Sequence, residues 1–118
     1  MIDREFCLSE VKARVQQFIE LRDWEQYHTP RNLAESISIE AAELLQIFQW
    51  MDVGRTKASL SSPDFRRKIT EELSDVLIYC LSLANVMKID ISEAIFEKIK
   101  INEKKYPVDS WKGKAWRS

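Results

Sequence analysis

Apolar residues recur at helical spacing near the start of the chain. Positions three and four residues apart fall on one face of an α-helix, so this spacing predicts a helix from Ser9, a good N-cap residue, to about Arg22. The apolar positions of this helix are Val11, Val15, Phe18 and Ile19. The next segment, residues 23–30, lacks the period and is predicted to be irregular.

A hydroxyl residue followed by proline precedes each of the next two helices. This pair suits the N-cap and the first helical position. Thr29 is predicted to cap a helix that ends near Met51, and Ser62 to cap one that ends near Met87. Residues 52–61 are expected to form the connecting loop.

The last predicted helix begins at Asp90, which has capping-box spacing with Glu93, and continues to about Lys105. Residues 108–118 form a tail with no clear period. The tail carries two tryptophans, so we expect it to pack on the body of the protein or on another subunit. These tryptophans are Trp111 and Trp116.

Four helices and few turn formers predict an all-α protein with a single domain over residues 1–118. Its core is expected at about 9–107 and its tail at 108–118. The 118 residues include only two Gly and three Pro, which suits helices better than many short strands. A chain of this length can bury one core but hardly a second.

The charge balance and the apolar stretches exclude some partners and favour a cytoplasmic protein. The net charge is −1, so no footprint for duplex nucleic acid is expected. No secretory signal or bilayer-spanning stretch is visible, so no membrane partner is expected. Cys7 and Cys80 form no C-x-x-C pair, which argues against a thiolate metal site.

Two predicted helices each carry a pair of acids spaced three residues apart. The pairs are Glu40 with Glu43 and Glu72 with Asp75. At about 100° per residue, Glu40 falls roughly 20° from Leu33, within the apolar stripe of its helix. The same arithmetic places Glu72 roughly 20° from Phe65 and Asp75 at the edge of the apolar stripe of its helix. We therefore expect both pairs to point inward.

Four inward-facing carboxylates need a compensating cation, because buried like charges otherwise force some of the acids to protonate. An all-oxygen ligand set favours Mg²⁺, with Mn²⁺ as a possible substitute, and Mg²⁺ favours a phosphate-bearing substrate. The alternative is that these acids are solvated helix charges, which explains most single strings of this kind. A di-iron bundle is a weak rival because it needs Glu-x-x-His on two helices, and the only His is His28.

The segment before the first acidic helix is rich in aromatic and hydrogen-bonding side chains, including Trp24, Tyr27 and His28. Such groups suit a nucleobase pocket, although they could equally close the end of the bundle. Trp50, Tyr79 and Asn102 could join the pocket. Three lysines of the last helix could neutralise phosphates, or could be ordinary solvated charges: Lys98, Lys104 and Lys105.

With these residues in place, the chain resembles the MazG-type all-α nucleoside triphosphate pyrophosphohydrolases, especially the dCTP pyrophosphatase branch. The resemblance spans nearly the whole chain. It rests on RDWEQYHTPRNLA at 22–34, EAAELLQIFQW at 40–50, EELSDVLIYCLSLA at 71–84 and NEKKYPV at 102–108. A difference is Val15, where the animal dCTP pyrophosphatases place a His in the pocket.

The resemblance implies site residues and an oligomeric state. It implies Mg²⁺ ligation, and hence catalysis, by Glu40, Glu43, Glu72 and Asp75, the same four acids chosen from helix geometry. It implies nucleotide contacts from Trp24, Tyr27, His28, Trp50, Tyr79 and Asn102. It also implies a homodimer or a homotetramer built as a dimer of dimers, in which helices of two subunits complete each site.

The predicted activity is hydrolysis of a nucleoside triphosphate to the monophosphate and diphosphate, with dCTP or a modified dCTP preferred. The expected role is removal of unwanted nucleotides from the pool. One alternative is a related pyrophosphohydrolase with another base specificity, such as dUTP. The other is a non-catalytic helical regulator that binds nucleotides.

Overall fold

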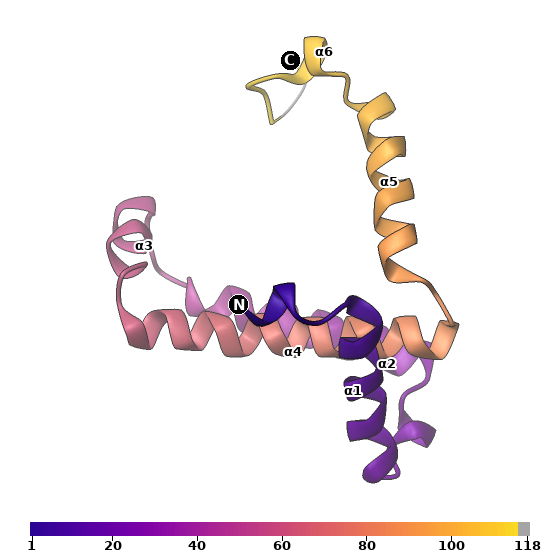
Figure 1. Cartoon of the computed structure of the whole chain (residues 1–118). Coiled ribbons are helices and arrows are strands. Elements are labelled where there is room, and N and C mark those ends of the chain that lie inside the picture. Colours follow the sequence, from indigo (N-terminus) through magenta and orange to yellow (C-terminus); the bar gives the residue numbers. More distant parts are fainter. Residues whose placement is uncertain (116–118) are drawn as a thin grey trace. The chain divides into compact units, whose positions relative to one another are not determined.

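A computed structural model describes residues 1–115, and these residues form helices and connecting turns with no β-strand (Figure 1). The predicted all-α class is confirmed. The long helices are α1 (Leu8–Leu21), α2 (Pro30–Ile47), α4 (Pro63–Met87) and α5 (Ile91–Lys105). The short ones are η1 (Ile2–Arg4), η2 (Glu25–Tyr27), α3 (Val53–Ser59) and α6 (Val108–Trp111). Trp116, one of the two predicted packing residues of the tail, lies outside the described residues.

Three of the long helices begin at the residues that the sequence predicts. Thr29, Ser62 and Asp90 are the N-caps of α2, α4 and α5. Their side-chain oxygens accept from the backbone N–H three residues later at 3.3, 3.4 and 3.0 Å. Each bond satisfies one N–H that a helix leaves without a partner in its first turn.

The predicted N-cap of the first helix is wrong by two residues. Helix α1 begins at Leu8 and its N-cap is Cys7, not Ser9. The carboxylate of Glu10 accepts a hydrogen bond from the Cys7 backbone N–H at 2.8 Å, so the reciprocal half of a capping box fixes the start. The Ser9 hydroxyl lies 3.1 Å from the Cys7 sulfur instead.

The predicted end of the second helix and the loop after it also differ from the structure. Helix α2 ends at Ile47, and Trp50 adopts a left-handed backbone with φ of 67°. The stretch predicted as a loop contains helix α3. Asp52 caps α3 by accepting from the Arg55 N–H at 2.7 Å, a second start signal that ends the preceding helix early.

The chain forms two compact units, Met1–Lys88 and Ile89–Ser118. In the first unit, α2 and α4 lie side by side in opposite directions and α1 crosses α4 (Figure 1). His28, just before α2, hydrogen-bonds to Ser82 near the end of α4, and the ring of Phe48, just after α2, packs on Phe65 near the start of α4. The two helices therefore run antiparallel. This register brings the middle of α2 to the first half of α4.

The buried apolar core of the first unit is small. Within residues 1–115 the buried apolar side chains are Val15, Ile19, Leu33, Phe65 and Ala84. They come from α1, α2 and α4, and they lie at positions that the helical period assigns to the inner faces. The core therefore holds these three helices in the arrangement that positions the acids of α2 and α4.

In the second unit, α5 buries none of its residues, and the ring of Trp111 packs edge to face on Tyr106 with centroids 5.0 Å apart. Packing of the tail on the body of the protein or on another subunit stays a prediction. Over residues 1–115, no helix combines the length and apolar character needed to cross a bilayer.

Candidate functional site

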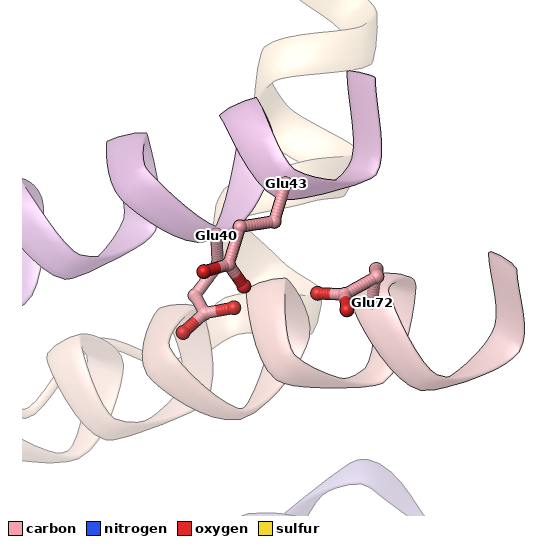
Figure 2. Close-up of side chains that lie close together, drawn as sticks. All are labelled: Glu40, Glu43 and Glu72. Atoms are coloured by element: carbon pink, nitrogen blue, oxygen red, sulfur yellow. The ribbon is translucent and has the colours of Figure 1, made fainter. Parts of the chain in front are cut away.

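Carboxylates from two helices converge in the first unit. Glu40 and Glu43 extend from one face of α2 toward α4, where Glu72 extends toward them (Figure 2). One carboxylate oxygen from each of the three residues lies within 4.8 Å of the others. The three-residue spacing on α2 places its two acids on neighbouring positions of one face, and the antiparallel register supplies the third acid.

Burial and mutual repulsion disfavour full ionisation of this acidic cluster, by which we mean Glu40, Glu43 and Glu72. The pKa of Glu40 is raised to about 7, first by burial and then by a hydrogen bond to Glu43 and the negative charges of Glu43, Asp75 and Glu72. The pKa of Glu72 is also raised, first by burial and then by Glu43. Both shifts follow from removing carboxylates from water and placing them together.

Two oxygens of the cluster are buried without a hydrogen-bond partner: Oε2 of Glu40 and Oε2 of Glu72. A buried acceptor that lacks a donor is costly, and a divalent cation would compensate both oxygens at once. Oxygen ligands at this spacing suit Mg²⁺ or Mn²⁺. The residues therefore fit a divalent cation.

Asp75, the fourth predicted ligand, is not among the three acids whose oxygens converge. It lies one helical turn after Glu72 on α4, and its negative charge contributes to the raised pKa values of Glu40 and Glu72. Its role as a ligand stays a prediction.

A cavity of about 550 Å³ lies between α2 and α4 beside the acidic cluster. Glu43 and Glu72 line it together with Lys68, which the sequence reasoning did not single out. Lys68 lies one turn before Glu72 and forms an ion pair with Asp64 at 3.4 Å. Its spacing from Glu72 was the available signal, because residues four apart share a helix face.

Trp24 is placed by the way α1 ends. Asp23 adopts a left-handed backbone with φ of 55°, its N–H bonds to the Glu20 carbonyl, and the Trp24 N–H bonds to the Ile19 carbonyl. These two bonds define a Schellman motif. The Trp24 ring meets Phe18 edge to face at 5.8 Å, which is the apolar contact that usually accompanies the motif.

His28 and Tyr79 come together across the interface between the turn before α2 and helix α4. Their rings are nearly parallel, with centroids 6.1 Å apart. The imidazole Nδ1 also lies 3.0 Å from the hydroxyl of Ser82, a residue that the sequence reasoning missed. His28 and Tyr79, two of the six predicted nucleotide contacts, are therefore adjacent. Tyr79 belongs to α4 and His28 packs on it.

Three further predicted nucleotide contacts belong to other segments of the chain. Tyr27 is exposed, Trp50 is 89% exposed after the end of α2, and Asn102 is on α5 in the second unit. The three lysines considered for phosphate binding are also on α5. Lys105 lies over the ring of Tyr106, 5.4 Å from its centroid. A role in substrate binding for these residues stays a prediction.

An all-α fold with acids converging from two antiparallel helices is the architecture that the sequence resemblance implied. The model of the MazG-like family matches residues 35–116, and the chain belongs to this family. The match includes all of α4 and α2 from residue 35 on, and these segments carry every acid of the cluster.

Two named relatives are dCTP pyrophosphatases. The chain is 40% identical over 100 residues to dCTP pyrophosphatase 1 of Homo sapiens, covering 85% of this chain and 59% of the relative. It is 37% identical over 108 residues to dCTP pyrophosphatase 1 of Bos taurus, covering 92% of this chain and 64% of the relative. The resemblance noted from the sequence is confirmed, although the chain spans less than two thirds of these relatives.

A solved structure shares the fold over more of its length. The crystal structure of a pyrophosphatase from Archaeoglobus fulgidus is 44% identical in sequence and superposes with a TM-score of 0.79. The match covers 85% of this chain and 92% of that one.

Proposed function

We propose that this chain is a Mg²⁺-dependent nucleoside triphosphate pyrophosphohydrolase. The reaction is (d)NTP plus water giving (d)NMP plus diphosphate, with dCTP or a modified dCTP preferred. The observation that carries the proposal is the acidic cluster, in which three carboxylates converge and two of their oxygens are buried without a partner. The names of the relatives support the reaction class, and those of the dCTP pyrophosphatases support the base preference.

Glu40, Glu43 and Glu72 would hold the cation, with Asp75 as a predicted fourth ligand. When bound, Mg²⁺ supplies positive charge that neutralises phosphate oxygens and lowers the pKa of a bound water. The carboxylates of the chain would fix where the cation binds, and a lysine beside them adds positive charge. The cavity beside the cluster is lined by Lys68, whose ammonium can pair with phosphate oxygens that the carboxylates repel.

The nucleoside part of the substrate is proposed to lie against the aromatic residues of the first unit, chiefly Trp24 and Tyr79. Aromatic faces stack on a nucleobase and exclude water from it. Tyr79 follows Asp75 by one turn on α4, so the nucleoside and phosphate sites would be consecutive along this helix. Tyr27, Trp50 and Asn102 remain predicted contacts.

The test is a panel of the common dNTPs and NTPs with diphosphate as the readout, with and without Mg²⁺. We expect Mg²⁺-dependent diphosphate release with dCTP among the best substrates. Glu43→Gln and Glu72→Gln should each lower kcat by at least about 100-fold, because each removes a carboxylate that would hold the cation acting on the reacting phosphates. Glu35→Gln, an exposed acid of α2 paired with Arg31, is the matched control.

The outcomes separate the alternatives. If another nucleotide such as dUTP is the best substrate, the proposed reaction class stands and the proposed base preference is wrong. Nucleotide binding without any diphosphate release would indicate a non-catalytic regulator. Full turnover by Glu43→Gln and Glu72→Gln would contradict the metal site.

We further propose that the chain acts as a homodimer or homotetramer in the cytoplasm, where it removes unwanted nucleotides from the pool. The support for an oligomer is the large apolar side chains exposed along α2. Ile39 and Leu45 are 59% and 71% exposed and line a groove of about 680 Å³ with Phe48. Apolar surface of this kind marks a protein interface, and a second copy of the chain is the proposed occupant.

A further inference from the structure

A partly buried hydrogen bond joins α4 to the turn that precedes α2. Ser82 is 1% exposed and is the only buried polar side chain in the part of the chain that the structure describes. Its hydroxyl lies 3.0 Å from Nδ1 of His28, 54 residues earlier in the sequence. A buried hydroxyl needs a partner, and the imidazole of His28 provides it.

The imidazole of His28 also lies beside the ring of Tyr79. The two rings are inclined by only 26°, with centroids 6.1 Å apart. Tyr79 precedes Ser82 by three residues and follows Asp75 by four, so all three share one face of α4. Ser82 thus holds one edge of the His28 ring, and the Tyr79 ring lies beside it in a nearly parallel orientation.

His28 also closes the turn that carries Trp24. Its backbone N–H donates to the Glu25 carbonyl at 3.1 Å, and the Tyr27 N–H donates to the Trp24 carbonyl at 2.9 Å. These bonds form the single turn η2. The bond from His28 to Ser82 therefore ties the whole turn to α4.

We propose that His28 and Ser82 are a positioning pair that holds the Tyr79 ring and the Trp24-bearing turn in the arrangement that binds the nucleoside. This inference rests on the proposed function. It assigns Ser82 a role, and it changes the role of His28 from a contact with the substrate to a support that acts through Tyr79.

The positioning role has its own kinetic signature. The nucleoside contacts are made in both the bound substrate and the transition state, so their loss raises KM and leaves kcat nearly unchanged. We expect Ser82→Ala and His28→Ala to raise KM for dCTP about fivefold or more, with kcat within about twofold of wild type. A substitution in the acidic cluster would instead lower kcat.

Two substitutions of His28 separate its ring from its hydrogen bond. His28→Asn keeps a polar group that can reach Ser82 but removes the ring, and His28→Phe keeps a ring but removes the bond. Both should raise KM if positioning requires the tethered ring. Wild-type KM in His28→Phe would overturn the proposal, because packing alone would then suffice.

A double-mutant cycle tests whether His28 acts through Tyr79. In a Tyr79→Leu background, the further change His28→Ala should raise KM by a smaller factor than it does in the wild type, because the Tyr79 ring is already absent and only the Trp24-bearing turn is released. The same increase in KM in both backgrounds would overturn the proposal and indicate that His28 touches the substrate.

An NMR experiment tests the pair without any substrate, so it does not depend on the enzymatic proposal. The chain has one His and three Tyr, and Tyr79→Phe assigns the Tyr79 ring signals. Ser82→Ala should shift the ring signals of His28 and Tyr79. Unchanged His28 and Tyr79 signals would overturn the pairing.

The variants are expected to fold, since a polar cavity of about 400 Å³ borders both His28 and Ser82 and can admit water to a group that loses its partner. Ser74→Ala is the matched control for Ser82→Ala. Ser74 is an exposed serine on the same helix, and its hydroxyl donates to the Thr70 carbonyl at 2.6 Å. A wild type without diphosphate release would refute the enzymatic proposal, while the NMR shifts would still decide the pair.

Discussion

Glu40 is the residue at which the electrostatics of the site are most concentrated. Its Oε2 is buried and unpaired, and burial and neighbouring acids raise its pKa to about 7. A carboxyl with this pKa carries a proton over part of the neutral range. Binding of a cation requires the ionised form, so metal and proton compete for this group.

Mg²⁺ binding should therefore depend on pH below about 7. At pH 6 we expect weaker binding than at pH 8, accompanied by release of a proton, because Glu40 must ionise. Calorimetry in buffers with different ionisation enthalpies measures this release. Glu40→Gln should abolish it and Glu35→Gln should preserve it. Equal affinity at pH 6 and pH 8 would contradict the prediction.

The raised pKa of Glu40 also predicts how the metal-free protein responds to pH. In the unfolded chain this carboxyl has its ordinary value of 4.5, so between about 4.5 and 7 the folded state holds a proton that the unfolded state has lost. The contribution of Glu40 to stability is complete below 4.5 and is lost as pH rises through about 7.

Thermal unfolding without metal should show that decline, and Mg²⁺ should raise the melting temperature more at pH 8 than at pH 5.5. In Glu40→Gln the decline over this pH range should be smaller. A Tm increase with Mg²⁺ that is independent of pH would show that Glu40 does not bind the cation.

At the residue scale the sequence predicted the partial burial of Glu40 and Glu72. The expectation that both members of each pair point inward is not confirmed, because Glu43 and Asp75 are exposed. Helix periodicity alone placed Glu40 within the apolar stripe, and the burial of its Oε2 agrees with this. The convergence of Glu43 with Glu72 depends on the register between α2 and α4. No periodicity within one helix contains that information.

At the scale of elements, the end of α1 determines the position of Trp24. Asp23 holds the left-handed conformation that the Schellman motif requires, a conformation that β-branched residues disfavour. The sequence contained a weak signal here, since Asp tolerates this conformation better than most residues.

We predict that Asp23→Val lowers the free energy of unfolding by about 1 kcal/mol or more, because a β-branched side chain clashes in this conformation. It should also raise KM for the nucleotide, since Trp24 follows directly. Asp23→Gly, which accepts the left-handed backbone without strain, should preserve both values. Chemical denaturation and steady-state kinetics measure the two effects. Equal stability of the Val and Gly variants would contradict the role of the motif.

Local signals predicted three helix starts and missed others for a physical reason. Thr29, Ser62 and Asp90 act through side chains that bond within their own first turn, so the sequence contains the whole interaction. Cys7 is a poor N-cap by residue type, and it acts as one because Glu10 bonds back to its N–H. Helix α3 was missed because its seven residues carry little apolar periodicity.

At the scale of the whole molecule, exposed apolar surface along α2 is the main feature that one chain leaves unexplained. Ile39 and Leu45 lie in the groove of this helix, where a second copy is proposed to pack. A small core stabilises a chain weakly, so further burial between copies would add to stability.

Leu45→Glu should therefore convert the wild-type oligomer into smaller species, since burying an unpaired carboxylate at the interface costs several kcal/mol. Light scattering coupled to size exclusion measures the mass. Gln17→Glu adds the same charge to an exposed position of α1 and should leave the mass unchanged. A monomeric wild type, or a Leu45→Glu variant of unchanged mass, would contradict the proposed interface.

The sequence by itself determined the all-α class and three of the helix starts, and it placed Glu40 and Glu72 on partly buried helix faces, because each of these depends on interactions within one helix. Tertiary structure decided which acids meet, the pairing of His28 with Ser82 and the nearness of Tyr79, because these contacts join segments separated by tens of residues. Spacing along one helix fixes the face on which a side chain lies. The antiparallel packing of α2 on α4 fixes what that side chain meets.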